Sequence, residues 1–171
     1  MTHAFANKED LLVLAGMDVV FGEMYPPAIG GHWKFELRKR GVSARAALRQ
    51  HPWAVGLMET TMNPGPASAE HHNATMGCLR EAGFGFREAV HAYNLLDSFT
   101  YGFALQEKTI PFATPEESAE MAKTTLGDMG ELYPYIAEVA IEFSKSGYSY
   151  TAEFEFGLDF ILDGLERLLG R

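Results

Sequence analysis

The stretch that decides the fold is Phe86 to Lys108, FREAVHAYNLLDSFTYGFALQEK. Its apolar residues recur every three or four positions, which is the spacing of one face of an α-helix. These residues are Ala89, Ala92, Leu96, Phe99 and Phe103. Further apolar side chains cover most of the remaining helix surface, so we predict a central and largely buried helix.

A polar stripe runs along another face of the same helix. It consists of His91, Asn94, Asp97, Ser98 and Tyr101. A buried polar group without a hydrogen bond costs about 1–3 kcal/mol, so each of these side chains needs a partner. The partners are either internal groups and water, or a bound ligand, and the stripe alone leaves both interpretations open.

The composition is that of one globular domain. The chain has 171 residues, of which 47% are hydrophobic. No apolar run approaches the roughly 20 residues that a membrane helix needs, and the first residues lack the pattern of a signal peptide. Cys78 is the only cysteine, which suits a reducing compartment. We therefore expect a cytoplasmic protein that does not contact a membrane.

The net charge of −9 disfavours binding of nucleic acid by this chain, because phosphate contacts need clustered Lys and Arg. One segment, residues 33–50, departs from this balance with six basic residues. They are Lys34, Arg38, Lys39, Arg40, Arg45 and Arg49. We interpret them as the solvated face of a helix whose other face is apolar.

Caps, prolines and glycines divide the rest of the chain into further helices. The expected helices span residues 7–24, 33–50, 53–61, 70–82, 132–144 and 151–169, and residues 109–127 form a loop with one solvated helix. No stretch shows the period-two alternation of a β-strand. The sequence predicts an all-α fold, an antiparallel bundle of about six to seven helices.

The last helix carries two apolar rows instead of one. The first row is Phe154, Leu158, Ile161, Leu165 and Leu168, and the second is Phe156, Phe160 and Leu169 with Gly157 and Gly164. A helix that is buried against one core needs a single row, so the second row predicts contact with another subunit. The alternative is a terminal helix that is fully embedded in its own domain.

No motif for catalysis or for a cofactor is present. His71 and His72 are adjacent, and neighbouring residues of a helix project about 100° apart, so the two rarely bind one metal ion. Asp97 could form an acid–base pair with a histidine, but nothing supplies a nucleophile or an oxyanion site. We therefore predict neither an enzyme nor a metal or cofactor site.

Five segments resemble one family of transcriptional regulators. They are HAFANKEDLL (3–12), AALRQHPW (46–53) with EAGF (81–84), SFTYGFALQE (98–107) and EFEFGLDFILDGLERL (153–168). The first is similar to the end of the recognition helix and the start of the next helix in TetR-family repressors. The others look like the ligand-binding domain of the tetracycline-repressor type, and the last is the most specific. The resemblance covers essentially the whole chain.

The resemblance implies a homodimer and an effector pocket. The dimer would be a four-helix bundle built from residues 86–108 and 151–169 of each copy. Its interface would contain Phe99, Phe103, Phe156, Gly157, Phe160 and Gly164. The pocket would be lined by Thr61, Asn63, His72, Thr75, Val90, Asn94, Asp97 and Ser98. Leu57 stands where tetracycline repressors have a metal-chelating histidine, so a tetracycline–magnesium ligand is not supported.

The implied function is that of a sensor. Residues 25–171 would form the effector-binding and dimerisation domain, and residues 1–24 would be the end of a DNA-binding domain with its connecting helix. DNA would be bound only through a helix-turn-helix that this chain lacks. The effector would be small and largely apolar, oriented by His72, Asn94 and Asp97. The alternative function is a helical dimerisation module without a ligand.

Overall fold

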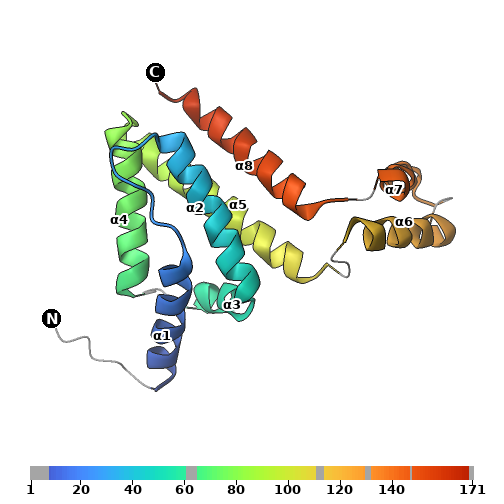
Figure 1. Ribbon diagram of the computed structural model, residues 1–171, viewed down its shortest axis with the longest axis horizontal. Coiled ribbons are helices and arrows are strands. Elements are labelled where there is room, and N and C mark those ends of the chain that lie inside the picture. The colour runs from blue at the N-terminus through green and yellow to red at the C-terminus, as the bar shows by residue number, and fades with distance from the viewer. Residues whose placement is uncertain (1–7, 61–64, 111–113, 130–131, 147, 170–171) are drawn as a thin grey trace. The chain divides into compact units, whose positions relative to one another are not determined.

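The computed structural model describes residues 8–60, 65–110, 114–129, 132–146 and 148–169. These residues contain eight helices and no strand, which confirms the all-α prediction with one helix more than the six or seven expected (Figure 1). The helices are α1 (Lys8–Glu23), α2 (Trp33–Gln50), α3 (Trp53–Thr60), α4 (Pro66–Glu81), α5 (Phe86–Lys108), α6 (Pro115–Met129), α7 (Pro134–Ser146) and α8 (Tyr150–Glu166).

The chain divides into two compact units. The first consists of Met1–Lys108 together with Glu155–Arg171, and the second is Thr109–Phe154. The first unit therefore holds α1 to α5 and most of α8, and the second holds α6 and α7. Each unit is described by itself.

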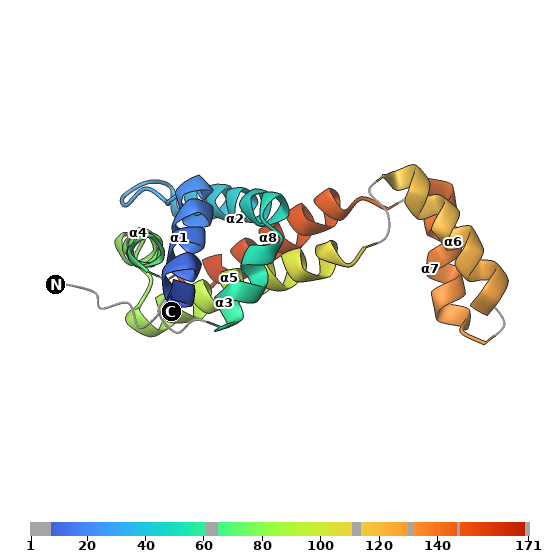
Figure 2. The ribbon, with the colours of Figure 1, turned by 90° about the horizontal axis from the view of Figure 1, so that it is seen from below.

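The core of the first unit lies around α1. Helix α1 packs against α2, α3 and α4, and α2 in turn packs against α5. Figure 2 shows α1 between α4 on one side and α2 with α3 on the other. The buried cluster contains Met17, Val20, Phe21, Met24, Ala44, Ala47, Leu48, Ala54, Val55 and Ala104. Full burial of a large apolar side chain contributes about 1.5–3 kcal/mol, so this cluster is a main source of stability for the unit.

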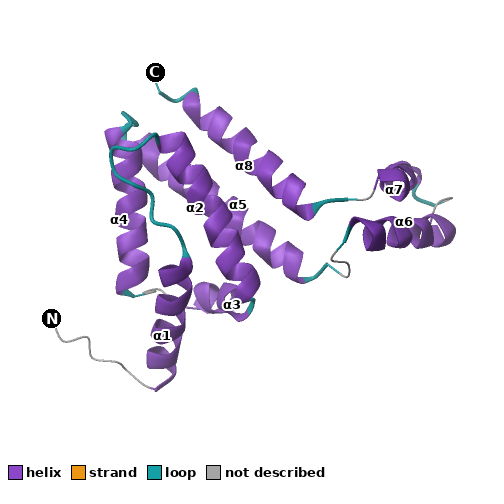
Figure 3. Ribbon diagram, viewed as in Figure 1, coloured by secondary structure: helices purple, strands orange, loops and turns teal. Residues whose placement is uncertain are grey.

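The connection between α1 and α2 is drawn in teal in Figure 3. It is fixed by the buried residue Glu36 of α2. Glu36 Oε2 accepts hydrogen bonds from the Ala28 backbone N–H at 2.8 Å and from the Tyr25 hydroxyl at 2.7 Å. The Tyr25 backbone N–H donates to Ser43 Oγ at 2.8 Å. The ammonium of Lys39 lies 3.6 Å from the centre of the Tyr25 ring. Four contacts thus tie the end of α1 to α2.

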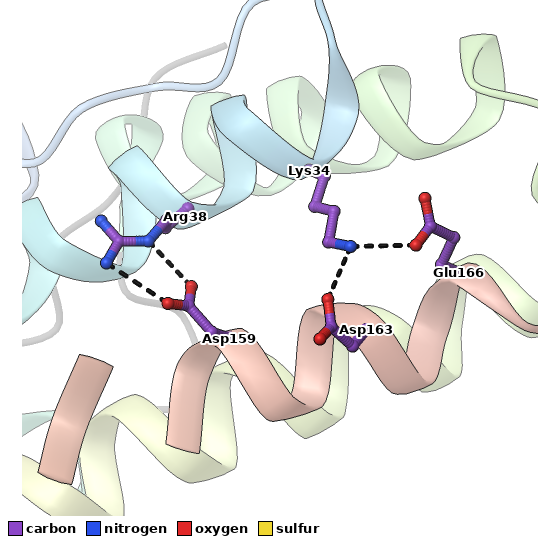
Figure 4. A network of polar contacts seen from close by, with 5 residues as sticks. All are labelled: Lys34, Arg38, Asp159, Asp163 and Glu166. Atoms are coloured by element: carbon purple, nitrogen blue, oxygen red, sulfur yellow. Dashed lines mark hydrogen bonds and ion pairs between the residues drawn. The ribbon is translucent and has the colours of Figure 1, made fainter. Parts of the chain in front are cut away.

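Helix α8 is attached to α2 by ion pairs at regular spacing (Figure 4). Arg38 Nε lies 2.8 Å from Asp159 Oδ1, and Lys34 Nζ lies 2.6 Å from Asp163 Oδ1. Arg38 also reaches Glu155, and Lys34 also reaches Glu166. These carboxylates recur every three or four residues, so one face of α8 is acidic where α2 is basic.

Two glycines allow α8 to approach its neighbours closely. A Cβ atom at Gly41 of α2 would lie 3.0 Å from Leu158 Cδ2, and one at Gly157 would lie 2.5 Å from Cζ of Phe99 on α5. Leu158, Leu162 and Leu165 are buried along α8. A glycine destabilises a helix by about 1 kcal/mol relative to alanine. At Gly41 and Gly157 the missing Cβ leaves room for the side chains of Leu158 and Phe99.

The second unit is a pair of helices, α6 and α7, that pack against each other. The buried residues of the pair include Ser118, Ala122 and Ala140, whose small side chains let the two backbones come close together. Of the described helices, none has the length and apolar character that crossing a membrane requires.

Candidate functional site

The interpretation of the basic face of α2 as solvated is wrong for Arg40 and Arg45. They are only 4% and 6% exposed and pair with Asp97 and Glu107 of α5. Their burial is possible because α5 places carboxylates opposite them, whereas Lys34 and Arg38 are less buried and pair with carboxylates of α8. Burying a charge without such a partner costs several kcal/mol.

The two buried pairs between α2 and α5 differ in how completely they are satisfied. Arg45 donates two hydrogen bonds to the Glu107 carboxylate, from Nε at 2.9 Å and from Nη2 at 2.6 Å. Arg40 Nη2 lies 2.7 Å from Asp97 Oδ1 in an ion pair, and Asp97 also has a side-chain hydrogen bond with Tyr93. Arg40 Nε and Thr100 Oγ1 are buried without a hydrogen-bond partner. Unsatisfied buried polar groups are rare, so these two atoms call for an explanation.

Two tyrosines of α5 surround the Arg40–Asp97 pair. Burial and then the Asp97 charge raise the pKa of Tyr93 and of Tyr101, so both phenols stay protonated. The Arg40 guanidinium lies 5.7 Å from the centre of the Tyr93 ring. Burial is the largest influence and by itself would lower the pKa of Arg40, but the charge and hydrogen bond of Asp97 together with Tyr101 and Tyr93 outweigh it, and the pKa is raised. The pair is therefore ionised and partly enclosed by aromatic rings.

Helix α4 adds His71, which faces both the pair and α1. Burial and then the positive charge of Arg40 lower the pKa of His71, and a hydrogen bond with the Phe21 backbone acts in the opposite direction. Its ring lies 5.5 Å from the ring of Phe21. His71 is therefore in contact with the connecting helix as well as with the field of Arg40. We use the name Arg40 cluster for Arg40, His71, Tyr93, Asp97, Thr100 and Tyr101.

Three of the residues predicted to line a pocket lie in or beside this cluster. Asp97 is a member of it. The ring of His72 stacks on Tyr93 at 4.1 Å between centroids, although the residue itself is exposed. Thr75 is buried on α4, and its hydroxyl donates to the His71 carbonyl at 2.8 Å, so its one donor is already used within the helix.

The remaining predicted pocket residues are more scattered. Val90 is half-buried, and Asn94 and Ser98 are exposed on α5. Thr61 and Asn63 lie outside the described residues. The structure thus brings Asp97, His72 and Thr75 near one another and leaves Asn94 and Ser98 at the surface of the protomer.

The sequence contained one signal that could have found Arg40. Arg40 stands three residues after Leu37 and four before Ala44, and all three are buried on one face of α2. A charge at a core position of an amphipathic helix predicts a buried partner. Within the described residues, no group of three His, Cys, Asp or Glu side chains is placed to hold a metal ion.

The family of the chain follows from comparison with known proteins. The family described as "Tetracyclin repressor-like, C-terminal domain" matches residues 26–169, so the chain belongs to that family. This confirms the resemblance to the C-terminal domain of TetR-type regulators.

Individual relatives agree with this membership. The chain is 24% identical, over 149 residues, to the HTH-type transcriptional repressor DrrR1 of Streptomyces coeruleorubidus. That alignment covers 82% of this chain and 54% of the repressor, so the chain spans about half the length of this relative.

Solved structures show the same fold. The TetR family protein ActR of Streptomyces coelicolor, in complex with actinorhodin, has a TM-score of 0.75 at 23% identity, covering 96% of this chain and 78% of ActR. A possible TetR family transcriptional regulator from Streptomyces coelicolor A3(2) has a TM-score of 0.71 at 29% identity, covering 95% of this chain and 80% of the regulator.

Proposed function

We propose that this chain is the effector-binding and dimerisation core of a ligand-responsive transcriptional repressor of the TetR family, acting in the cytoplasm. The observation that carries the proposal is the family match over residues 26–169, which includes all of α2 to α8. In this proposal DNA is bound through a helix-turn-helix domain of the TetR type, and not by the residues described here.

The effector site is the Arg40 cluster with the predicted residues beside it. Support comes from two buried polar atoms without hydrogen bonds, Arg40 Nε and Thr100 Oγ1, beside the Asp97 carboxylate. The site takes a small, largely apolar molecule, because its surroundings are the rings of Tyr93, Tyr101 and His71. ActR has been solved with actinorhodin, so actinorhodin is the first compound to test on this chain.

The dimer forms through α5 and α8. Phe156 and Phe160 are 69% and 71% exposed on α8, and Leu95 and Leu105 are exposed on α5. Exposed apolar faces on two adjacent helices are typical of a subunit interface. Gly164, also exposed on α8, belongs to this predicted interface. Phe99, Phe103 and Gly157 complete the predicted interface, although Phe99 and Gly157 already meet within one protomer.

The signal passes from the effector to α1. His71 contacts Phe21 of α1 and senses the charge of Arg40, and Glu36 fixes the connection between α1 and α2. An effector that binds one arrangement of α1 more tightly than another shifts the equilibrium between them. This shift would change the spacing of two DNA-binding domains in a dimer.

Native mass spectrometry of the purified protein, followed by the same sample denatured, tests this function. A dimer with a discrete excess mass that vanishes on denaturation supports both the assembly and the effector site. A dimer that carries no excess and does not bind added actinorhodin or other small molecules favours the alternative, a dimerisation module without a ligand. A monomer contradicts the proposed assembly.

A further inference from the structure

We propose that the effector is an uncharged molecule that offers both a hydrogen-bond acceptor and a hydroxyl group to the Arg40 cluster. The acceptor takes the Nε–H of Arg40, and the hydroxyl is shared between Asp97 and Thr100. This inference rests on the proposed function and adds the chemical class of the ligand.

The comparison of the two Arg–carboxylate pairs is the first argument. Both pairs join α2 to α5, and both are buried. Arg45 uses Nε and Nη2 on Glu107, so that pair is complete as it stands. Arg40 leaves Nε unused, and Thr100 Oγ1 is also without a hydrogen bond. The Asp97 carboxylate is engaged by Arg40 and Tyr93, and its two oxygens together can accept further hydrogen bonds. One unused donor, one unused hydroxyl and the remaining capacity of a carboxylate are therefore available at this pair.

The second argument is the charge of the site. Arg40 and Asp97 neutralise each other, and the phenols of Tyr93 and Tyr101 are protonated. An anionic or cationic ligand would add an uncompensated charge in surroundings where Arg40 is only 4% exposed, which is costly. A neutral molecule avoids this cost and still makes hydrogen bonds to charged groups, which are the stronger kind.

The third argument is access. The Asp97 side chain retains an exposure of 14%, whereas that of Arg40 is 5%, so the pair meets solvent on the carboxylate side. Thr100 lies three residues further along the same helix and is buried. A ligand that enters beside Asp97 meets the carboxylate first, and Arg40 Nε and Thr100 Oγ1 deeper in the protein.

The experiment uses three small probes of matched shape. They are 3-hydroxyacetophenone, which has both groups, acetophenone, which lacks the hydroxyl, and 3-hydroxybenzoate, which carries a negative charge. Binding is followed in the ¹⁵N-labelled dimer by the NMR signals of the arginine Nε–H groups. Molecules of this size bind with dissociation constants on the order of millimolar, which titration by NMR can measure.

We expect 3-hydroxyacetophenone to shift the Arg40 Nε–H signal and to leave the Arg45 signal in place. Acetophenone and 3-hydroxybenzoate should each bind about tenfold more weakly, the first for lack of a hydrogen bond to a charged group and the second for its charge. Equal affinity for acetophenone, tighter binding of the benzoate, or binding that leaves Arg40 Nε–H unchanged would overturn the proposal.

Variants of Thr100 and Asp97 test whether these two residues bind the probe, and a variant of Glu107 is the matched control. Thr100→Val keeps the shape of the side chain and should lower the affinity for 3-hydroxyacetophenone about fivefold. Asp97→Asn should lower the same affinity about tenfold. Glu107→Gln makes the same change in the other buried pair and should leave the affinity within about twofold, so it reports any loss of binding that comes from stability alone. If Asp97→Asn does not fold, Thr100→Val decides. An unchanged affinity in Thr100→Val would remove Thr100 and the shared hydroxyl from the proposal.

Failure of this inference differs visibly from failure of the proposed function. A dimer that binds acetophenone or the benzoate best remains an effector-binding core with a different ligand class. A protein that is monomeric by native mass spectrometry fails the proposed function whatever the probes do. A dimer that binds none of the three probes overturns the ligand class, and binding of actinorhodin to that dimer would still support the effector site.

Discussion

Glu36 is the single residue that fixes the connection between α1 and α2. Its carboxylate accepts hydrogen bonds from the Ala28 N–H and from the Tyr25 hydroxyl. These two donors, with Ala28 the larger influence, hold the pKa of Glu36 below its usual value of 4.5. The ionised form is therefore favoured in the folded protein more than in the unfolded chain, where the donors are absent.

This pKa shift predicts a pH-dependent loss in the variant Glu36→Gln. A depressed pKa stabilises the fold fully above the unfolded value, and the contribution disappears as the pH falls through the lower, folded value. We expect Glu36→Gln to lower the midpoint of urea unfolding at pH 7 and to lie closer to the wild type at pH 3.

Glu81→Gln serves as the control, because Glu81 is exposed at the end of α4. Its small effect should be the same at both values of pH. If the gap between Glu36→Gln and the wild type does not narrow on acidification, the carboxylate charge is not what holds the connection.

At the same scale, sequence patterns located polar residues of the site but not their partners. The periodicity of residues 86–108 identified Asp97 and Tyr101 as polar positions on a buried helix. The pattern of residues 33–50 predicts a solvated face for Arg40, opposite an apolar one, whereas Arg40 pairs with Asp97 inside the protein. Periodicity describes one helix at a time, and a buried ion pair depends on two helices.

At the scale of elements, α8 depends on charge as well as on apolar packing. Arg38 and Lys34 of α2 each pair with two carboxylates of α8. Exposed ion pairs are individually weak, but several in register along two helices set which faces meet. The acidic face of α8 therefore orients the helix so that Phe156 and Phe160 remain outside.

The variant Arg38→Gln should show this dependence. Arg38 is 38% exposed, so its pairs with Asp159 and Glu155 are screened by solvent and together contribute about 0.5–1 kcal/mol at low salt. Urea unfolding in 20 mM and in 1 M NaCl measures the difference, which should shrink at high salt because the screening length falls to about 3 Å.

Lys123→Gln is the matched control for Arg38→Gln. Lys123 pairs only locally with Glu120, three residues earlier in α6, and both side chains are exposed. Its loss should be smaller at low salt, and it should therefore change less between the two salt concentrations. An Arg38→Gln effect no larger than that of Lys123→Gln would mean that the ion pairs do not hold α8.

The first and last residues of the helices show how far local sequence signals predict where a helix begins and ends. Helix α5 spans Phe86–Lys108, the stretch chosen from sequence, because its apolar period and the preceding glycines are local signals. Helix α4 begins at Pro66 instead of residue 70. Proline is well suited to the first turn of a helix, and Gly65 before it adopts a φ of 96°, so the helix starts earlier than the expected cap.

At the scale of the whole molecule, the exposed faces of α5 and α8 require a partner to become buried. Phe160 is 71% exposed, and its ring lies 6.3 Å from that of Phe156. In the proposed dimer, with two-fold symmetry, each substitution would count twice, because both copies contribute the same surface. We therefore expect the proposed interface to be sensitive to a single charged residue at its centre.

Phe160→Glu is predicted to convert the dimer to a monomer and to keep the helical content. Two buried like charges cost several kcal/mol, which corresponds to a loss of affinity of about 100-fold or more. Size-exclusion chromatography with light scattering measures the mass, and circular dichroism measures the helices. Phe35→Glu, at an aromatic residue of α2 that is 62% exposed, should remain dimeric. A dimer in both variants would place the interface elsewhere.

The sequence by itself determined the helices, the bounds of the helix at residues 86–108, the two-sided character of α8 and the TetR resemblance. It overestimated the burial of residues 86–108, because only Ala89, Ala92, Leu96, Thr100 and Ala104 are buried on that helix. These properties follow from apolar periods, caps and breakers, which act between residues a few positions apart. Only the tertiary structure decided which charges are satisfied. Arg45 and Glu107 are 62 residues apart, and Arg38 and Asp159 are 121 apart, so no local pattern pairs them. The same holds for Arg40 and Asp97, whose incomplete pairing marks the candidate site because two separate helices must meet to create it.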